Sequence, residues 1–142
     1  MKKEPPEIFI DTNVWFSSLY GSINSEKLID AHIKGKIMAA MSRQVLVETV
    51  RNFKEKLPNA ILIFEKLVKE NPPVINKNPE KISSSVKNLV HPKDQIILQS
   101  AVDAKIKIFV TGNTKHFDKN QIEKRLKIKI LTPKQAVNEL RL

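Results

Sequence analysis

Apolar residues fall along the chain in two alternating patterns, short unbroken runs and longer stretches with helical spacing. Short unbroken runs are typical of strands covered on both faces, as in a parallel sheet between helices. They predict strands at residues 8–10, 37–41, 74–75, 106–110 and 128–131. Apolar residues recurring every three to four positions predict helices at residues 14–20, 25–34, 42–57, 59–71, 82–89, 92–101, 122–126 and from 133 onward.

The order of these elements predicts the fold class. Because strands and helices alternate, we expect right-handed crossovers and a three-layer α/β/α sandwich around a central, mainly parallel sheet. Residues that end or begin helices support the boundaries. Gly35 is placed to end one helix, Ser42 to cap the next, and Thr132 with Pro133 to start the last.

The length and composition are those of a single domain. A chain of 142 residues can bury a core without disulfides or structural metals, so we expect one domain over residues 1–142. The absence of cysteine excludes a disulfide framework and suits the cytoplasm. The longest strongly apolar stretch, residues 60–64, is far shorter than the roughly 20 residues of a membrane-spanning helix. Residues 1–7 are charged and do not resemble a secretory leader, so we expect a cytoplasmic protein without membrane contact.

The charge of the chain points to a polyanionic partner. Twenty-five Lys and Arg residues against fifteen Asp and Glu residues leave a net charge of +10, which favours nucleic acid as that partner. Thermal adaptation or simple solubility can produce the same surplus. No aromatic-rich basic stretch of the kind that stacks bases is visible in the sequence.

Asp11 ends the first predicted strand. In open α/β sheets the crevice beyond the carboxyl ends of the strands binds ligands, so an acid at this position is a candidate for chemistry. The plainer interpretation is that Asp11 caps the helix that follows, because Asp, Thr and Asn are all good N-caps.

Two further acids are candidates. Asp94 lies in the first turn of a predicted helix and shares a face with Ile97 and Leu98, so its carboxylate points toward the core unless it is a solvent-facing cap. Glu48 lies nearly opposite the helix stripe predicted around Leu46, Val50 and Phe53, which describes an ordinary solvated glutamate unless the flank of its helix faces the crevice.

Thr111, Gly112 and Asn113 end another strand. They make either a plain turn or a second polar group at the same edge of the sheet. If Asp11, Asp94 and Asn113 converge, a hard divalent cation with oxygen ligands is the simplest way to hold the carboxylates together.

These motifs, taken in order, resemble the PIN-domain nucleases. They are Asp11-Thr12-Asn13 after a leading strand, a mid-chain Glu48, Pro92-Lys93-Asp94 opening a helix, and Val110-Thr111-Gly112-Asn113 followed by Lys115-His116-Phe117. More narrowly, nearly the whole chain resembles the toxins of VapBC-type toxin–antitoxin pairs.

The resemblance implies a Mg²⁺- or Mn²⁺-dependent endoribonuclease that is usually dimeric and is inhibited by a cognate antitoxin. It places Asp11, Glu48 and Asp94 at the positions of the acidic metal ligands and catalytic residues, and Asn113 where many members carry a fourth acid. An amide removes one negative charge, so the number of metal ions stays open, and Asp118 is an alternative ligand from the same loop. Thr12, Asn13 and Thr111 would orient ligands, whereas Lys93, Lys115 and His116 either contact the RNA backbone or are ordinary surface charge.

Other site types fit the sequence poorly. Three histidines without cysteine or close pairing do not predict a zinc site, and three glycines make neither a P-loop nor a dinucleotide fingerprint. A haloacid-dehalogenase-like phosphotransferase needs a second acid where Asn13 stands. The main alternative is a basic, catalytically weak PIN-like module that binds RNA or a protein without cleavage, which Asn113 favours.

Overall fold

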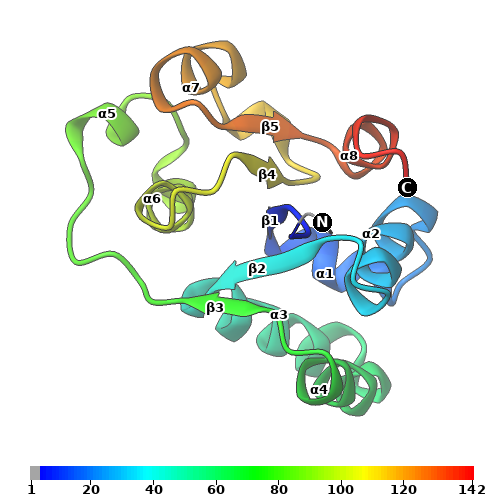
Figure 1. Ribbon diagram of the computed structural model, residues 1–142. Coiled ribbons are helices and arrows are strands. Elements are labelled where there is room, and N and C mark those ends of the chain that lie inside the picture. The colour runs from blue at the N-terminus through cyan, green and yellow to red at the C-terminus, as the bar shows by residue number, and fades with distance from the viewer. Residues whose placement is uncertain (1–3) are drawn as a thin grey trace.

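The computed structural model describes residues 4–142 and contains one five-stranded parallel sheet. The strand order is β3-β2-β1-β4-β5, so β1 lies at the centre of the sheet (Figure 1). All four pairings between neighbouring strands are parallel. The strands are β1 Glu7–Ile10, β2 Met38–Ser42, β3 Val74–Asn76, β4 Ile108–Val110 and β5 Lys129–Leu131.

Helices lie on both sides of this sheet (Figure 1), which confirms the predicted three-layer α/β/α class. The α-helices are α1 Thr12–Ser18, α2 Ile23–Ile33, α3 Arg43–Lys56, α4 Ile61–Glu70, α5 Ser84–Lys87, α6 Gln95–Asp103, α7 Lys119–Leu126 and α8 Pro133–Glu139. Three short 3₁₀ turns complete them: η1 Pro58–Ala60, η2 Pro92–Asp94 and η3 Thr114–His116. In the described residues, no helix has the length and apolar character needed to cross a membrane.

Local sequence signals fix most of the helix ends. The hydroxyl of Ser42 accepts a hydrogen bond from the backbone N–H of Val45 and caps α3. Thr132 and Gln135 form a reciprocal capping box at the start of α8. Gly35 follows α2 with a φ of +76°, a conformation that glycine adopts without steric cost. The predicted ends at these three places are confirmed.

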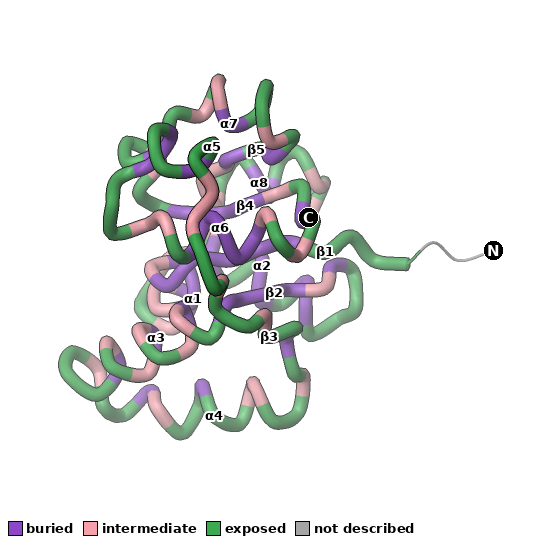
Figure 2. Tube along the Cα trace, turned by 90° about the vertical axis from the view of Figure 1, so that its left-hand side faces the viewer, coloured by how far each residue is buried: buried purple, intermediate pink, exposed green. Residues whose placement is uncertain are grey.

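The core lies on both faces of the central strands. Phe9 of β1 and Phe109 of β4 are fully buried and stack with their ring centroids 4.9 Å apart. Trp15 is also buried, and its indole N–H donates to the carbonyl of Ile10 (2.9 Å), so the polar edge of this large side chain is satisfied. Beyond the exposed first residue of β1 and the half-buried first residue of β4, these two strands are buried (Figure 2).

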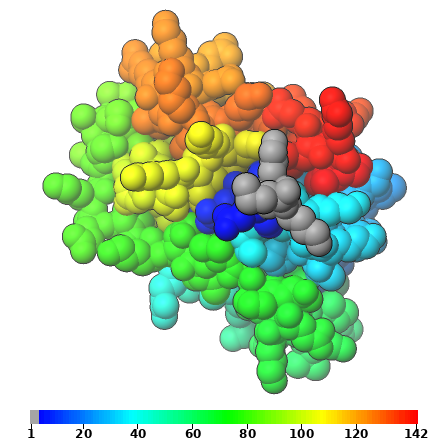
Figure 3. Space-filling view, viewed as in Figure 1, coloured from blue at the N-terminus to red at the C-terminus, as the bar shows by residue number. Residues whose placement is uncertain are grey.

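Helix α4 is the least covered of the long helices. Phe64 is its one buried residue, whereas Leu62 and Ile63 are 75% and 57% exposed. The helix stands at the lower edge of the molecule, on the side opposite α7 (Figure 3). A cavity of about 770 Å³ lies beside it and is lined by Leu19 of the α1 C-terminus and by residues of α2 and α4, among them Ile23, Ile33, Ile63 and Leu67. We call this cavity the α2–α4 groove.

Several boundaries differ from the sequence predictions, and one prediction lies partly outside the described residues. Strand β4 begins at Ile108 rather than at 106, because Lys105 adopts a positive φ and the chain turns before it enters the sheet. Asp94 ends a 3₁₀ turn that precedes α6, so it is not part of the regular helix. The predicted absence of a secretory leader concerned residues 1–7, of which residues 1–3 lie outside the described residues.

Candidate active site

The carboxylate of Asp11 lies at the carboxyl end of the central strand, and neighbouring groups bind both of its oxygens. Oδ1 accepts a hydrogen bond from the backbone N–H of Thr12 (2.8 Å), and Oδ2 accepts one from the hydroxyl of Thr111 (2.9 Å). Only 4% of Asp11 is exposed. Asp11 therefore caps α1, as the plainer interpretation predicts, and also holds a buried carboxylate at the end of the strand.

Burial raises the pKa of the Asp11 carboxyl from 3.8 to about 6. Loss of contact with water is the largest cause, and the negative charges of Asp94 and Glu48 raise the pKa further. The hydrogen bonds from Thr12 and Thr111 act in the opposite direction. Two carboxylates that are far from Asp11 in the sequence thus lie within electrostatic reach of it. In residues 4–142, no Lys or Arg forms an ion pair with Asp11 or Glu48.

Glu48 joins this cluster through Thr12. The Thr12 hydroxyl donates to Glu48 Oε2 (2.9 Å), while the Thr12 backbone N–H binds Asp11. The other oxygen, Oε1, accepts a hydrogen bond from the side-chain amide of Gln44, one helical turn earlier (3.0 Å). One hydrogen bond to each oxygen thus orients the Glu48 carboxylate, and Thr12 connects it to Asp11. The sequence did not single out Gln44, although a glutamine four residues before a candidate acid is a detectable signal.

Of the two orientations that the sequence left open for Glu48, the structure has the one in which a flank of its helix faces the acids. Val45, Thr49 and Phe53 are the fully buried residues of α3, and Leu46 and Val50 pack against the core partly buried. Thr49 can be buried because its hydroxyl donates to the carbonyl of Val45 (2.7 Å). The half-buried Glu48 is next to Thr49 in the helix and reaches Thr12 of α1.

Asp94 is half-buried, with 17% of its side chain exposed, and contacts a residue far along the chain. Its Oδ2 lies 3.0 Å from Nδ1 of His116. Two loops bring these residues together, because Val90 and Phe117 form an antiparallel β-bridge. The bridge also places the rings of His91 and His116 side by side, with centroids 5.2 Å apart. The sequence interpretation found no close histidine pair because the contact is not local.

A tight turn after β4 closes the site on the other side. The backbone N–H of Gly112 donates to Asn13 Oδ1 (2.7 Å), and a Cβ at Gly112 would lie 3.0 Å from the same oxygen. A side chain at this position would crowd the Asn13 carboxamide, so glycine suits this close approach. The Asn13 amide in turn lies 3.4 Å from the Thr111 hydroxyl and 3.5 Å from Asp11 Oδ2. Asn13 and Thr111 hold Asp11 in place, together with Thr12.

The remaining candidates lie on the surface around these acids. Asn113 is exposed, and its backbone N–H, not its side chain, reaches the Thr111 hydroxyl (3.1 Å). Asp118 caps α7 by accepting a hydrogen bond from the backbone N–H of Gln121, so its carboxylate already has a structural task. Lys93, Lys115 and His116 are exposed.

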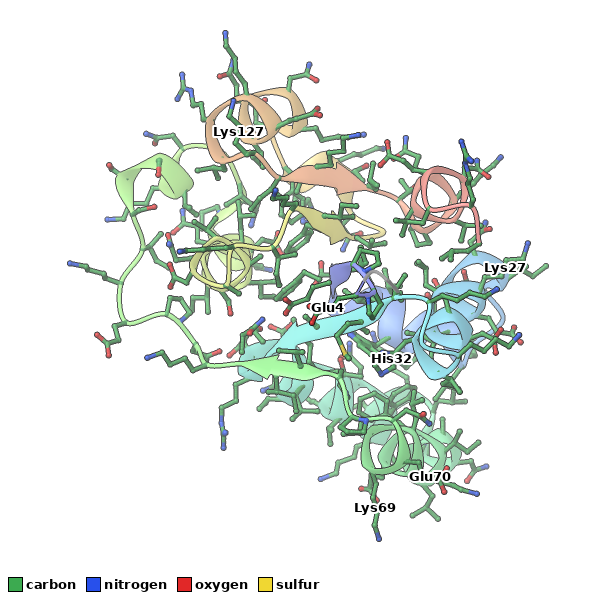
Figure 4. All side chains as sticks on the ribbon, in the orientation of Figure 1. Glu4, Lys27, His32, Lys69, Glu70 and Lys127 are labelled. Carbon is green, nitrogen blue, oxygen red and sulfur yellow. The ribbon has the colours of Figure 1, made fainter. Side chains whose placement is uncertain are left out.

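The third histidine plays a structural part. His32 is buried, with its Nε2 2.8 Å from the carbonyl of Asn71, while its Nδ1 accepts a hydrogen bond from the backbone N–H of Ala39. Its side chain lies between α2, β2 and the end of α4 (Figure 4). With both ring nitrogens bonded to the backbone, His32 is not a free ligand.

The acids have the chemistry of a divalent-cation site, but not that of a closed one. In the part of the chain that the structure describes, no three Asp, Glu, His or Cys side chains are grouped tightly enough to hold an ion alone. Mg²⁺ commonly binds one or two carboxylates directly and keeps several waters. Three neighbouring carboxylates without a cationic side chain of Lys or Arg therefore suit a cation that stays partly hydrated.

Comparison with known proteins gives one family and one fold. A family model described as "PIN domain" matches residues 7–115. A chain in the crystal structure of VapBC2 from Rickettsia felis bound to a DNA fragment from their promoter superposes with a TM-score of 0.61 at 14% identity. The match covers 89% of this chain and 98% of that chain, and at this identity it establishes a shared fold. No curated protein sequence matches significantly.

Proposed function

The chain belongs to the PIN domain family, and from this premise we propose that it is a divalent-metal-dependent endoribonuclease. The observation that carries the proposal is the buried carboxylate of Asp11 at the end of the central strand, joined to Glu48 through Thr12. The charges of Asp94 and Glu48 also raise the pKa of Asp11. Acids that repel one another beyond the carboxyl end of a parallel strand are costly for the fold unless they bind a ligand.

In this proposal Asp11, Glu48 and Asp94 hold Mg²⁺ or Mn²⁺, with Asn113 at the edge of the site. When bound there, the cation lowers the pKa of water and offsets the negative charge on the phosphoryl oxygens. The protein's own part is to position the acids. Thr12 links two of them, since its backbone N–H binds Asp11 and its hydroxyl binds Glu48.

The surface charge supports RNA as the substrate. The chain carries +10 overall, and in the described residues only Lys34, Lys66 and Lys129 form ion pairs with acids. Charged side chains radiate outward over the helices, for example Lys69 from α4 and Lys127 from the end of α7 (Figure 4). Lys93 and Lys115, next to the acids, are the residues that we propose to contact the phosphate backbone.

We further propose that the protein is the toxin of a toxin–antitoxin pair. A solved structure of the same fold contains VapBC2 bound to a DNA fragment from the promoter. The α2–α4 groove, with its apolar walls and the exposed Ile23 and Ile63, is the surface that suits an apolar segment of an antitoxin. A cytoplasmic location and a homodimer remain predictions of the same proposal.

The experiment that tests cleavage uses Asp94→Asn with a matched control. Asp30→Asn removes the same charge from an exposed ion pair on α2 and is expected to cleave RNA like the parent protein. We expect the parent to cleave RNA only with Mg²⁺ or Mn²⁺, and folded Asp94→Asn to be at least 100-fold slower. Undiminished cleavage by a folded Asp94→Asn protein would remove Asp94 from the mechanism.

The second candidate function is an RNA-binding module without nuclease activity. The exposed amide Asn113 in place of an acid favours it, as does the open grouping of the acids. The same assay decides between the two functions. A parent protein that binds RNA but leaves it intact with either metal would be such a module.

A further inference from the structure

We propose that His91 and His116 form a binding subsite for one nucleobase of the RNA, beside the acidic site. This inference rests on the proposed function, because it assumes that the chain binds RNA. It adds a residue, His91, for which neither the sequence motifs nor the acidic cluster gives a task.

Backbone hydrogen bonds join the two loops that carry the imidazole rings. The backbone N–H of His91 donates to the carbonyl of His116 (2.9 Å), next to the β-bridge between Val90 and Phe117. The backbone N–H of Asp118 donates to the carbonyl of Leu89 (2.8 Å) on the other side of the bridge. The two loops are thereby joined into one short ribbon, whose residues Leu89, Val90 and Phe117 are buried in the core.

Each ring is also fixed by its own Nδ1. Nδ1 of His91 accepts a hydrogen bond from the backbone N–H of Lys93 (3.3 Å). Nδ1 of His116 donates to Asp94 Oδ2 (3.0 Å), because a carboxylate oxygen can only accept. The rings are tilted by 30° with centroids 5.2 Å apart. Both rings are therefore ordered before any ligand arrives, which lowers the entropic cost of binding.

The pair has the position and the surroundings of a nucleotide site. Both histidines are exposed, and 45% of the His116 side chain is accessible to solvent. His116 forms a hydrogen bond with Asp94, and Asp94 in turn lies within electrostatic range of Asp11. Lys93, two residues after His91, and Lys115, directly before His116, are exposed cations. An aromatic face next to cations is the combination with which proteins hold an unpaired base and its phosphate.

Other aromatic rings cannot serve this purpose. The phenylalanines at positions 9, 53, 64, 109 and 117 are buried in the core. Tyr20 is exposed, but it lies beyond the C-terminus of α1, at the opposite end of this helix from Asp11, and packs against Phe16. The imidazole pair is thus the aromatic surface that borders the acids in the described residues.

The test measures binding without cleavage and uses three substitutions of His91. The probe is a short single-stranded RNA in which 2-aminopurine replaces one base at successive positions, measured with EDTA present. Stacking on an aromatic ring quenches this fluorophore. His91→Phe keeps an aromatic face, His91→Asn keeps an acceptor for the Lys93 N–H without an aromatic face, and His91→Ala keeps neither.

We expect the parent protein to quench one position of the probe. His91→Asn and His91→Ala should bind about tenfold more weakly and lose this quenching. His91→Phe should stay within about threefold of the parent. An RNA that lacks the base at the quenched position should bind the parent and His91→Asn equally well.

The outcomes separate this inference from the proposed function. If His91→Asn binds and quenches like the parent, or if His91→Phe is as weak as His91→Ala, the base subsite is refuted while RNA binding stands. If the parent protein binds no RNA, the proposed function fails and the subsite fails with it. If the parent binds and quenches but cleaves nothing, the subsite stands and the nuclease activity fails.

Discussion

Replacing Asp11 by Asn should make the protein more stable at neutral pH while it abolishes metal binding. In the folded protein, burial raises the pKa of this carboxyl to about 6, against 3.8 for the ordinary group. Ionisation of Asp11 therefore lowers the free energy of unfolding. This loss of stability is absent below pH 3.8, grows as the pH rises toward 6, and is complete above pH 6.

The size of the effect follows from this difference. A change of about two pKa units, at about 1.4 kcal/mol each, corresponds to about 3 kcal/mol at neutral pH. Asn carries no charge, so the variant avoids this cost. Its side-chain oxygen can still accept the hydrogen bond from the Thr12 N–H, and Asn is an equally good N-cap. The Thr111 hydroxyl must turn to accept from the new amide, which reduces the gain.

Urea unfolding between pH 4 and pH 8, with EDTA present, measures the difference between the variant and the parent. We expect the variant to be about 1–3 kcal/mol more stable at pH 7.5, and the difference to shrink toward zero near pH 4. Adding Mn²⁺ should stabilise the parent and leave the variant unchanged, since only a folded site that binds the ion gains from it.

The control is Asp118→Asn, in which an exposed cap of α7 is replaced by another good cap. We expect its stability to stay within about 0.5 kcal/mol of the parent. A variant at Asp11 that is less stable than the parent at pH 7.5, or whose gain does not depend on pH, would refute the argument from burial.

The other predictions concern activity, packing and RNA binding. Gln44→Ala should lower the initial rate of RNA cleavage about fivefold, because Glu48 loses one hydrogen bond of about 1 kcal/mol. Gln44→Glu should lower this rate further, because the new carboxylate repels that of Glu48. EDTA should stop cleavage by the parent protein, and excess Mn²⁺ should restore it in the same sample. Gly112→Ala should lower the free energy of unfolding by about 1–2 kcal/mol, measured in urea, because its Cβ meets the Asn13 carboxamide. Lys93→Ala should weaken RNA binding, measured by titration at several salt concentrations. The slope of the logarithm of affinity against the logarithm of salt concentration should fall by about one phosphate contact, whereas Lys27→Ala on α2 should change neither the affinity nor the slope.

The sequence predicts those parts of the structure that depend on neighbouring residues. The run before Asp11 predicts a buried strand, and Ser42, Gly35 and Thr132 mark helix ends through hydrogen bonds or dihedral angles within a few residues. Asp11 itself could be located because the carboxyl end of a parallel strand is a defined position in the fold.

Contacts between distant residues could not be predicted in the same way. The orientation of Glu48 could not be decided, because Thr49, a polar residue that the apolar pattern does not mark, is buried through a hydrogen bond to the carbonyl of Val45. The pairing of His91 with His116 depends on a single β-bridge between two loops, for which no periodic pattern exists. The support of Glu48 by Gln44 becomes meaningful only once Glu48 is known to face the acids.

The strand order of the sheet has a consequence during synthesis of the protein. The two residues that bond in the middle of the site, Asp11 and Thr111, are separated by 100 positions, because β1 pairs with β4 across the sheet. A nascent chain on the ribosome therefore carries Asp11 and Glu48 long before it carries Asp94 and Thr111. A protein that we propose to cut RNA would complete its site only after the segment that contains Thr111 has been synthesised.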